Sequence, residues 1–149
     1  MTTSSYLLLY HEFYRRRIAA LKEQVKKLYQ RLPPEVYRQH ETVKFAARIR
    51  EADQNIIPQN PDRPEYRLSG DLRKFRRYKQ GLQRYRILFS FSNKPQIILY
   101  LYLNDSAHLR KADGRSDPYE EFKKHLRRGD FSHDPNDPKM RKWVEQYSW

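Results

Sequence analysis

A dense group of basic side chains lies in the middle of the chain, where it could bind or cleave a phosphodiester. Seven basic residues fall within fourteen positions: Arg73, Lys74, Arg76, Arg77, Lys79, Arg84 and Arg86. A guanidinium group binds two phosphate oxygens at once, and several such charges around one phosphate would stabilise the transition state of RNA transesterification. From the spacing alone, a basic face that binds RNA without cutting it is an equally good interpretation.

The composition gives little support to other kinds of active site. The chain has no cysteine, which excludes thiol catalysis, disulfides and thiolate metal sites, and its four glycines favour no phosphate-binding loop. The histidines lack zinc-site spacing and no acidic cluster suits magnesium, so we expect neither a metal nor a cofactor. His108, in a basic loop, is a candidate general acid or base. His40 lies on an apolar helical face and is predicted to be a core residue.

The overall charge indicates a polyanionic partner. The 149 residues carry a formal net charge of +13, and 38% of them are hydrophobic, enough for a folded core. Nucleic acid is the first candidate partner, and an anionic membrane surface or an acidic protein are alternatives. A role in solubility alone is a weaker explanation of this excess of positive charge, because repulsion between like charges destabilises the fold. No signal peptide or membrane span is evident, so we expect a cytoplasmic protein.

Periodic segments predict how these side chains are positioned within a single domain, residues 1–149. Tyr6–Tyr10 predicts a strand and 12–32 predicts a helix, because its apolar residues recur every three or four positions. Pro33 and Pro34 end that helix, and 35–54 predicts a second helix that forms an α-hairpin with it.

Three further segments, 72–78, 83–91 and 96–103, predict an antiparallel meander whose last strand is apolar on both faces. In the first of them and at the residue that follows it, Arg73, Arg77 and Lys79 would share a face with Phe75. A final helix is predicted to begin at Asp117 as N-cap and to be followed by a polar and then aromatic tail, residues 130–149. The expected fold is α+β, with a strand and a two-helix hairpin packed on a mostly antiparallel four-stranded sheet.

Two stretches carry a resemblance to a known family. Residues 81–91, with Tyr85-Arg86 followed by apolar residues, resemble the central strand of RelE-type toxins. The ordered set that follows is similar to the YhaV type within that superfamily: an apolar strand ending in Asn104-Asp105, then Leu109-Arg110, Asp117-Pro118-Tyr119 and Arg128-Gly129. The likeness spans about residues 6–129. Phe75 and Tyr102 stand where the pattern has tryptophan, and the loop before the final helix is longer than in RelE-type toxins.

The resemblance implies a RelE-like fold and an endoribonuclease toxin that cleaves mRNA, often on translating ribosomes. It also implies a cognate antitoxin similar to PrlF, through which the toxin would reach operator DNA. Matched to the family pattern, Arg86 would contact the scissile phosphate, and Arg77 and Lys79 would supply base and charge-stabilising groups. Arg110 would be a further phosphate ligand, and Tyr119 would stack on a base or assist proton transfer.

These roles lead to an expected mechanism without a metal ion. The RNA 2′-OH attacks its own 3′-phosphate while Lys79 or Arg77 helps to remove or relay the proton, and Tyr119 or His108 protonates the leaving oxygen. The RNA-binding residues would be Arg73, Lys74, Arg76, Arg84 and His108. Two alternatives use the same surface: an RNA- or ribosome-binding protein that does not cut, and a degenerate toxin that acts as a co-repressor with its antitoxin.

Overall fold

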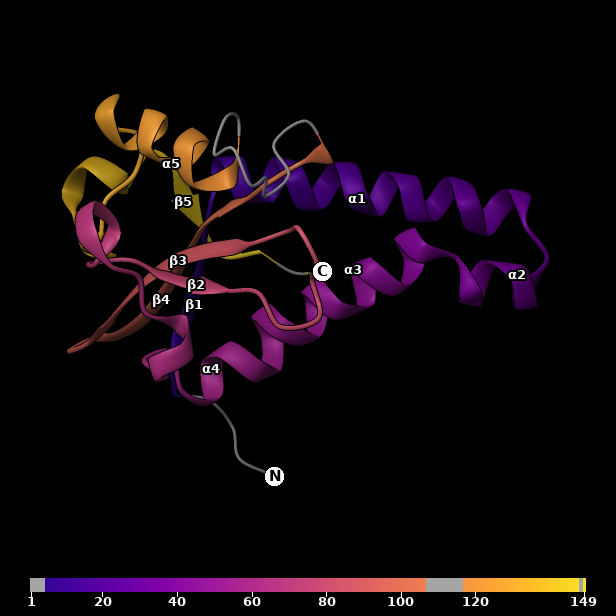
Figure 1. The fold of residues 1–149 in the computed structure, drawn as a ribbon, viewed down its shortest axis with the longest axis horizontal. Coiled ribbons are helices and arrows are strands. Elements are labelled where there is room, and N and C mark those ends of the chain that lie inside the picture. The colour runs from indigo at the N-terminus through magenta and orange to yellow at the C-terminus, as the bar shows by residue number, and fades with distance from the viewer. Residues whose placement is uncertain (1–4, 107–116, 148) are drawn as a thin grey trace.

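One five-stranded sheet forms the centre of the fold (Figure 1). The computed structural model describes residues 5–106, 117–147 and 149. The strands are β1 (Leu7–His11), β2 (Arg76–Tyr78), β3 (Ile87–Asn93), β4 (Gln96–Leu103) and β5 (Val144–Glu145), in the order β2–β3–β4–β1–β5. β1 runs parallel to β4, and the other neighbouring pairs are antiparallel.

The predicted α+β class is therefore confirmed, and the meander of β2, β3 and β4 forms as expected. The sheet has five strands rather than four because two residues of the C-terminal tail pair with the outer edge of β1. Val144 lies opposite His11 and Glu145 opposite Tyr10. The tail is therefore partly built into the sheet.

The helix α1 (Glu12–Arg31) follows β1 directly and extends beyond the sheet (Figure 1). His11 caps its N-terminus, since its Nδ1 accepts a hydrogen bond from the Phe13 amide at 3.1 Å. The predicted apolar face is buried only in its first half, at Tyr14, Ile18 and Leu21. Burial lowers the pKa of His11 to about 4, so this imidazole is neutral at physiological pH.

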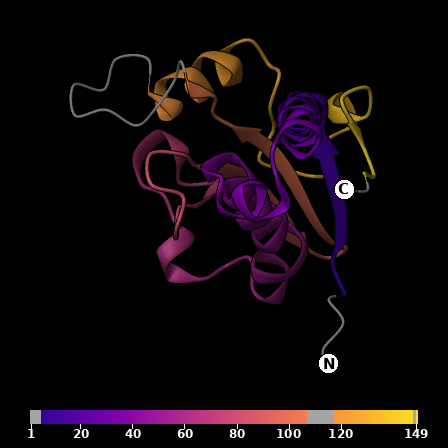
Figure 2. The same cartoon turned by 90° about the vertical axis from the view of Figure 1, so that its right-hand side faces the viewer.

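The second predicted helix is interrupted. It consists of α2 (Pro34–Gln39), α3 (Glu41–Glu51), a π-helical turn η1 (Ala52–Ile56) and the short α4 (Ile57–Gln59). The break falls at His40, whose backbone is extended and whose Nδ1 accepts a hydrogen bond from the Thr42 amide at 3.1 Å. His40 is therefore a half-buried N-cap rather than a core residue. Figure 2 shows α1 nearly end-on, with α3 beside it.

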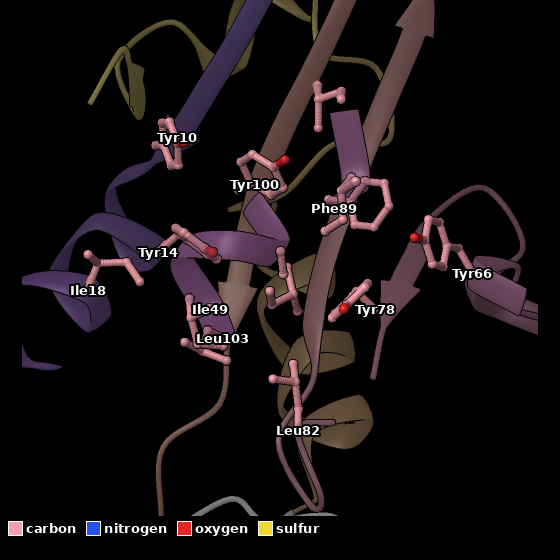
Figure 3. Close-up of a cluster of buried hydrophobic side chains, with 14 of the residues drawn as sticks. Tyr10, Tyr14, Ile18, Ile49, Tyr66, Tyr78, Leu82, Phe89, Tyr100 and Leu103 are labelled. Carbon is pink, nitrogen blue, oxygen red and sulfur yellow. The ribbon is translucent and has the colours of Figure 1, made fainter. Parts of the chain in front are cut away.

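Two apolar clusters cover the two faces of the sheet. The first joins α1, α3 and α4 to the sheet and includes Tyr14, Ile49 and Tyr100 (Figure 3). The second lies under α5 (Pro118–Arg127) and includes Leu101 and Phe122. Because both faces are covered, β4 is buried on both sides, as its continuous apolar sequence predicted.

A buried carboxyl group lies within the first cluster. Asp53, in η1, is 0% exposed, and its side chain accepts hydrogen bonds from the Tyr14 hydroxyl at 2.8 Å and from Gln54 at 3.0 Å. The indole Nε1 of Trp149 lies 3.1 Å from both carboxyl oxygens, and the Tyr100 hydroxyl donates to the Asp53 carbonyl at 2.7 Å. The C-terminal residue is thereby attached to the core.

This environment predicts a specific pH dependence of stability. Burial raises the pKa of Asp53 from 3.8 to about 7, so between these values the folded protein holds a proton that the unfolded chain has released. Stability therefore falls as the pH rises through this range. In Asp53→Asn that contribution is absent. Between pH 5 and pH 8 the stability of the variant relative to wild type should rise by about 3 kcal/mol, because the slope is about 1.4 kcal/mol per pH unit up to about pH 7.

Urea unfolding of both proteins at the two pH values measures this difference. The opposite contribution of His11, whose pKa is lowered, is common to both proteins and cancels. A stability difference that does not change with pH would show that Asp53 is ionised throughout this range.

Candidate active site at one end of the sheet

The register of the sheet brings three chain segments together at one end. Tyr78, the last residue of β2, lies opposite Ile87, the first of β3, and Ile87 lies opposite Leu103, the last of β4. The residues just beyond these strand ends, Lys79, Arg86 and Asn104, therefore meet at the same edge. We call this the basic edge of the sheet.

Arg86 lies immediately before β3, and its side chain is half-buried. Its Nη1 donates hydrogen bonds to the carbonyl oxygens of Gln83 and Tyr85, the latter at 2.7 Å. Its Nε is buried and has no hydrogen-bond partner among the residues that the structure describes. A buried donor without an acceptor is costly, so this guanidinium would gain stability by turning its Nε towards an anion.

Arg77 has the same property. It occupies the middle of β2, and its Nη1 donates to the Tyr119 hydroxyl at 3.1 Å. Its Nε, too, is buried without a partner within the described part of the chain. Tyr119 lies in the first turn of α5, which begins as predicted with Asp117 as N-cap accepting from the Glu120 amide at 3.0 Å. The tertiary fold thus brings together two predicted site residues that are 42 positions apart.

Asn104 connects the segments of the basic edge. Its side chain is 0% exposed; its Oδ1 accepts from the Arg86 amide at 2.7 Å, and its Nδ2 donates to the Arg84 carbonyl at 3.2 Å. Its own carbonyl accepts from Arg17 Nε of α1 at 3.2 Å. The family pattern contains Asn104 without assigning it a role, and no motif in the sequence singles out Arg17. For Asn104, the sequence signal is that a polar residue directly follows a strand that is apolar on both faces.

Three basic residues predicted to bind RNA do not lie on a strand in the way that the sequence predicts or already have a partner. Arg73 and Lys74 are exposed and precede β2, which begins only at Arg76, so the predicted alternation does not extend back to them. Arg76 binds Asp62 at 3.0 Å, and its guanidinium lies 5.4 Å from the centre of the Phe91 ring. This arginine already has an acidic partner, which disfavours it as an RNA ligand.

Lys79 and Arg84 are exposed at the basic edge. Phe75, expected to share a face with basic residues, is only 3% exposed and packs edge-on against Phe122 of α5. Arg110 and His108 lie outside the described residues.

Two hollows flank the basic edge, and Arg17 lines both of them. One, of about 340 Å³, lies between α1, α3 and the loop that joins β2 to β3. The other, of about 330 Å³, lies between the start of α1, the end of β4 and α5, and it includes Asp105 and His125. His125 is held between Glu121 at 3.3 Å and Asp130 at 3.1 Å. Burial is the main cause that lowers the pKa of Arg17 from its ordinary value.

Neither a metal site nor a membrane span is found in the described structure. Within residues 5–106, 117–147 and 149, no group of three or more acidic or histidine side chains is arranged to hold a metal ion. None of the helices that the structure describes combines the length and the apolar character needed to cross a bilayer.

The fold is that of a small α+β protein, and its basic edge combines two arginines and an adjacent tyrosine hydroxyl, groups of the kind that bind a phosphodiester. Comparison with known proteins identifies the family. Residues 8–141 match the model of the YhaV toxin family, described as a toxin with endonuclease activity, of a toxin–antitoxin system. The chain therefore belongs to the YhaV toxin family, which confirms the resemblance and the expected class of nuclease.

Individual relatives agree with this assignment. The ribonuclease toxin YhaV of Escherichia coli strain K12 is 33% identical over 109 residues, which cover 70% of this chain and 69% of that protein. The toxin YhaV of Escherichia coli O157:H7 matches to the same extent. No solved structure matches the chain.

Proposed function

We propose that this chain is the RNA-cleaving toxin of a toxin–antitoxin module and that its active site is the basic edge. One observation carries the proposal: Arg77 in β2 and Arg86, just before the neighbouring β3, both have a buried Nε without a partner in the described structure. The register places Arg77 opposite Leu88, two residues from Arg86. One phosphate group at this edge could accept from both guanidinium groups if their buried Nε atoms turn towards it.

The proposed reaction is transesterification by the RNA itself. The 2′-oxygen attacks the adjacent phosphorus, the bond from phosphorus to the 5′-oxygen breaks, and the products carry a 2′,3′-cyclic phosphate and a 5′-OH. Arg86 and Arg110 bind the non-bridging oxygens and so stabilise the charge of the transition state. Lys79 helps to remove the proton of the 2′-OH, or Arg77 relays it while remaining a guanidinium cation. Lysine and arginine side chains are in general poor proton acceptors at neutral pH, so we expect slow cleavage unless the ribosome orients the mRNA.

Tyr119 is the proposed donor to the leaving 5′-oxygen, with His108 as the alternative. The Tyr119 oxygen accepts the hydrogen bond from Arg77, so its own proton points to a different acceptor. The side chain is half-buried at the start of α5, beside β2. Arg77 therefore positions the hydroxyl and at the same time binds the phosphate.

The partners follow from this proposal. mRNA and the translating ribosome, met in the cytoplasm, are the proposed targets. An antitoxin similar to PrlF would cover the basic edge and carry the pair to operator DNA. The net charge of +13 suits both an RNA backbone and an acidic antitoxin segment.

Tyr119→Phe tests the proposal. Induced expression of wild type should arrest bacterial growth and create new 5′-OH ends in cellular RNA. Tyr119→Phe should cleave a purified RNA about 100-fold more slowly, within the range for loss of a general acid. A substrate with p-nitrophenolate in place of the 5′-nucleoside needs no protonation of its leaving group, so on it the variant should match wild type.

Three outcomes contradict parts of this proposal. Normal growth and intact RNA with folded wild type would favour a binding protein or a degenerate toxin. An equal loss on both substrates would mean that Tyr119 positions Arg77 and is not the acid. No loss on either substrate would favour His108.

A further inference from the structure

We propose that the hollow between α1, α3 and the β2–β3 loop binds a nucleotide of the RNA next to the scissile phosphate. This inference rests on the proposed function and deepens it, because it assigns a site for reading the substrate. We call it the nucleotide pocket. Its volume of about 340 Å³ is suited to one nucleotide, and it opens beside the basic edge.

The pocket is continuous with the proposed phosphate site. Gln83 and Tyr85 line it, and their carbonyl oxygens accept hydrogen bonds from Arg86 Nη1. Arg17 lines it from α1 and donates to the carbonyl of Asn104, which holds the Arg86 amide. A phosphate bound at Arg86 would therefore have its neighbouring nucleotide at the entrance of the pocket.

The pocket contains an aromatic surface on which a base can stack. The rings of Phe45 and Tyr85 lie 4.6 Å apart between centres, inclined at 47°, and both residues are half-buried. The guanidinium of Arg17 lies 5.9 Å from the centre of the Tyr85 ring. Half-buried aromatic rings beside arginine are the usual platform for unpaired RNA bases.

The charged and polar groups of the pocket could bind the phosphate of a nucleotide and the polar edge of its base. Lys44 and Arg48, one turn apart on α3, are exposed, and neither forms an ion pair in the part of the chain that the structure describes. Together with Arg17 they outnumber the one acidic residue of the lining, Glu41. Basic groups would bind phosphate, while a carboxylate and the amide of Gln24 can bond to the edge of a base.

A charge reversal tests the pocket without touching the proposed catalytic residues. The variant is Lys44→Glu with Arg48→Glu. Its matched control is Lys26→Glu with Lys27→Glu, the same charge change at two exposed lysines of α1 that do not line the pocket. The probes are the four ribonucleoside 5′-monophosphates, titrated into ¹⁵N-labelled protein and observed at the Gln24 and Gln83 side-chain amides and the Thr42 backbone amide.

In wild type, we expect these signals to shift, with different affinities for the four nucleotides. The pocket variant should bind at least 10-fold more weakly, and the control should stay within about 2-fold of wild type, since its charges act only at long range. The pocket variant should also lose sequence preference at the nucleotide next to the cut.

Several results would overturn the inference. Equal shifts with inorganic phosphate alone would show an anion site that does not read a base. Shifts with a glutamate-rich peptide but not with nucleotides would show that the pocket receives an acidic protein segment. Equal weakening in both variants would mean that only net charge matters. Nucleotide binding does not depend on cleavage, so an inactive protein that still shows these shifts would refute the proposed function and support the pocket.

Discussion

Arg86→Ala is expected to slow RNA cleavage by about 100-fold to 1,000-fold, the range found when one donor to a developing anion is removed. The reason is the geometry of the guanidinium. Its Nη1 is held by two main-chain carbonyls, while its buried Nε has no partner among the described residues and would gain one if it turned towards a bound phosphate. Arg86→Lys retains a charge but cannot form the same fork, so its rate should lie between those of Arg86→Ala and wild type.

A matched control separates catalysis from stability. Arg15 is also half-buried and also bonds main-chain carbonyls, those of Tyr10 at 2.8 Å and Trp143 at 3.3 Å, but it lies near β5, away from the basic edge. Arg15→Ala should destabilise the protein to a similar extent and leave the rate of the folded fraction unchanged. Single-turnover rates with thermal melts of each variant provide the measurement. If both variants lose activity in proportion to stability, Arg86 is structural.

Asn104→Leu is expected to lower the free energy of unfolding by about 2–4 kcal/mol, because it leaves the Arg86 amide and the Arg84 carbonyl without their buried partner. Leucine has nearly the shape of asparagine, so the loss reports hydrogen bonds rather than a cavity. For a chain of this length, the melting temperature should fall by roughly 4–15 °C. Asn136→Leu, at an exposed site, should change stability by no more than about 0.5 kcal/mol.

The same substitution should also reduce cleavage, since the loop that bears Arg84 and Arg86 loses its attachment to β4. We expect the loss in the maximal rate to exceed the change in the Michaelis constant, because the displaced group acts on the transition state. Asn104→Asp keeps the acceptor for the Arg86 amide and should restore part of the rate. Full activity in Asn104→Leu after correction for unfolding would show that this residue supports only the fold.

The sequence predicted those elements whose signals are local. The three-and-four spacing of apolar residues in α1, the Pro33-Pro34 stop, the Asp117 cap and the continuous apolar run of β4 all depend on neighbours within a few positions. The basic stretch was also visible, and its residues Arg77 and Arg86 do lie at one edge. The family pattern, being an ordered set of short motifs, was recognisable for the same reason.

The sequence was less informative where weak local signals compete. The apolar spacing of 35–54 is compatible with one helix, yet His40 offers its ring nitrogen to the Thr42 amide and begins a new one. Arg73 and Lys74 fit the alternation of a strand, but pairing with β3 starts only at Arg76. The start of α3 and the start of β2 are thus each set by where hydrogen bonds form. The periodicity of apolar residues does not contain that information.

By itself, then, the sequence determined the class of fold, the family and the location of the basic stretch, because periodicity, caps and charge are properties of neighbouring residues. Only the tertiary structure decided which side chains meet. The bond from Arg77 to Tyr119 spans 42 positions, that from Arg86 to Asn104 spans 18, and that from Trp149 to Asp53 spans 96. Such contacts form only when packing brings distant donors and acceptors into one buried place, where each must find a partner.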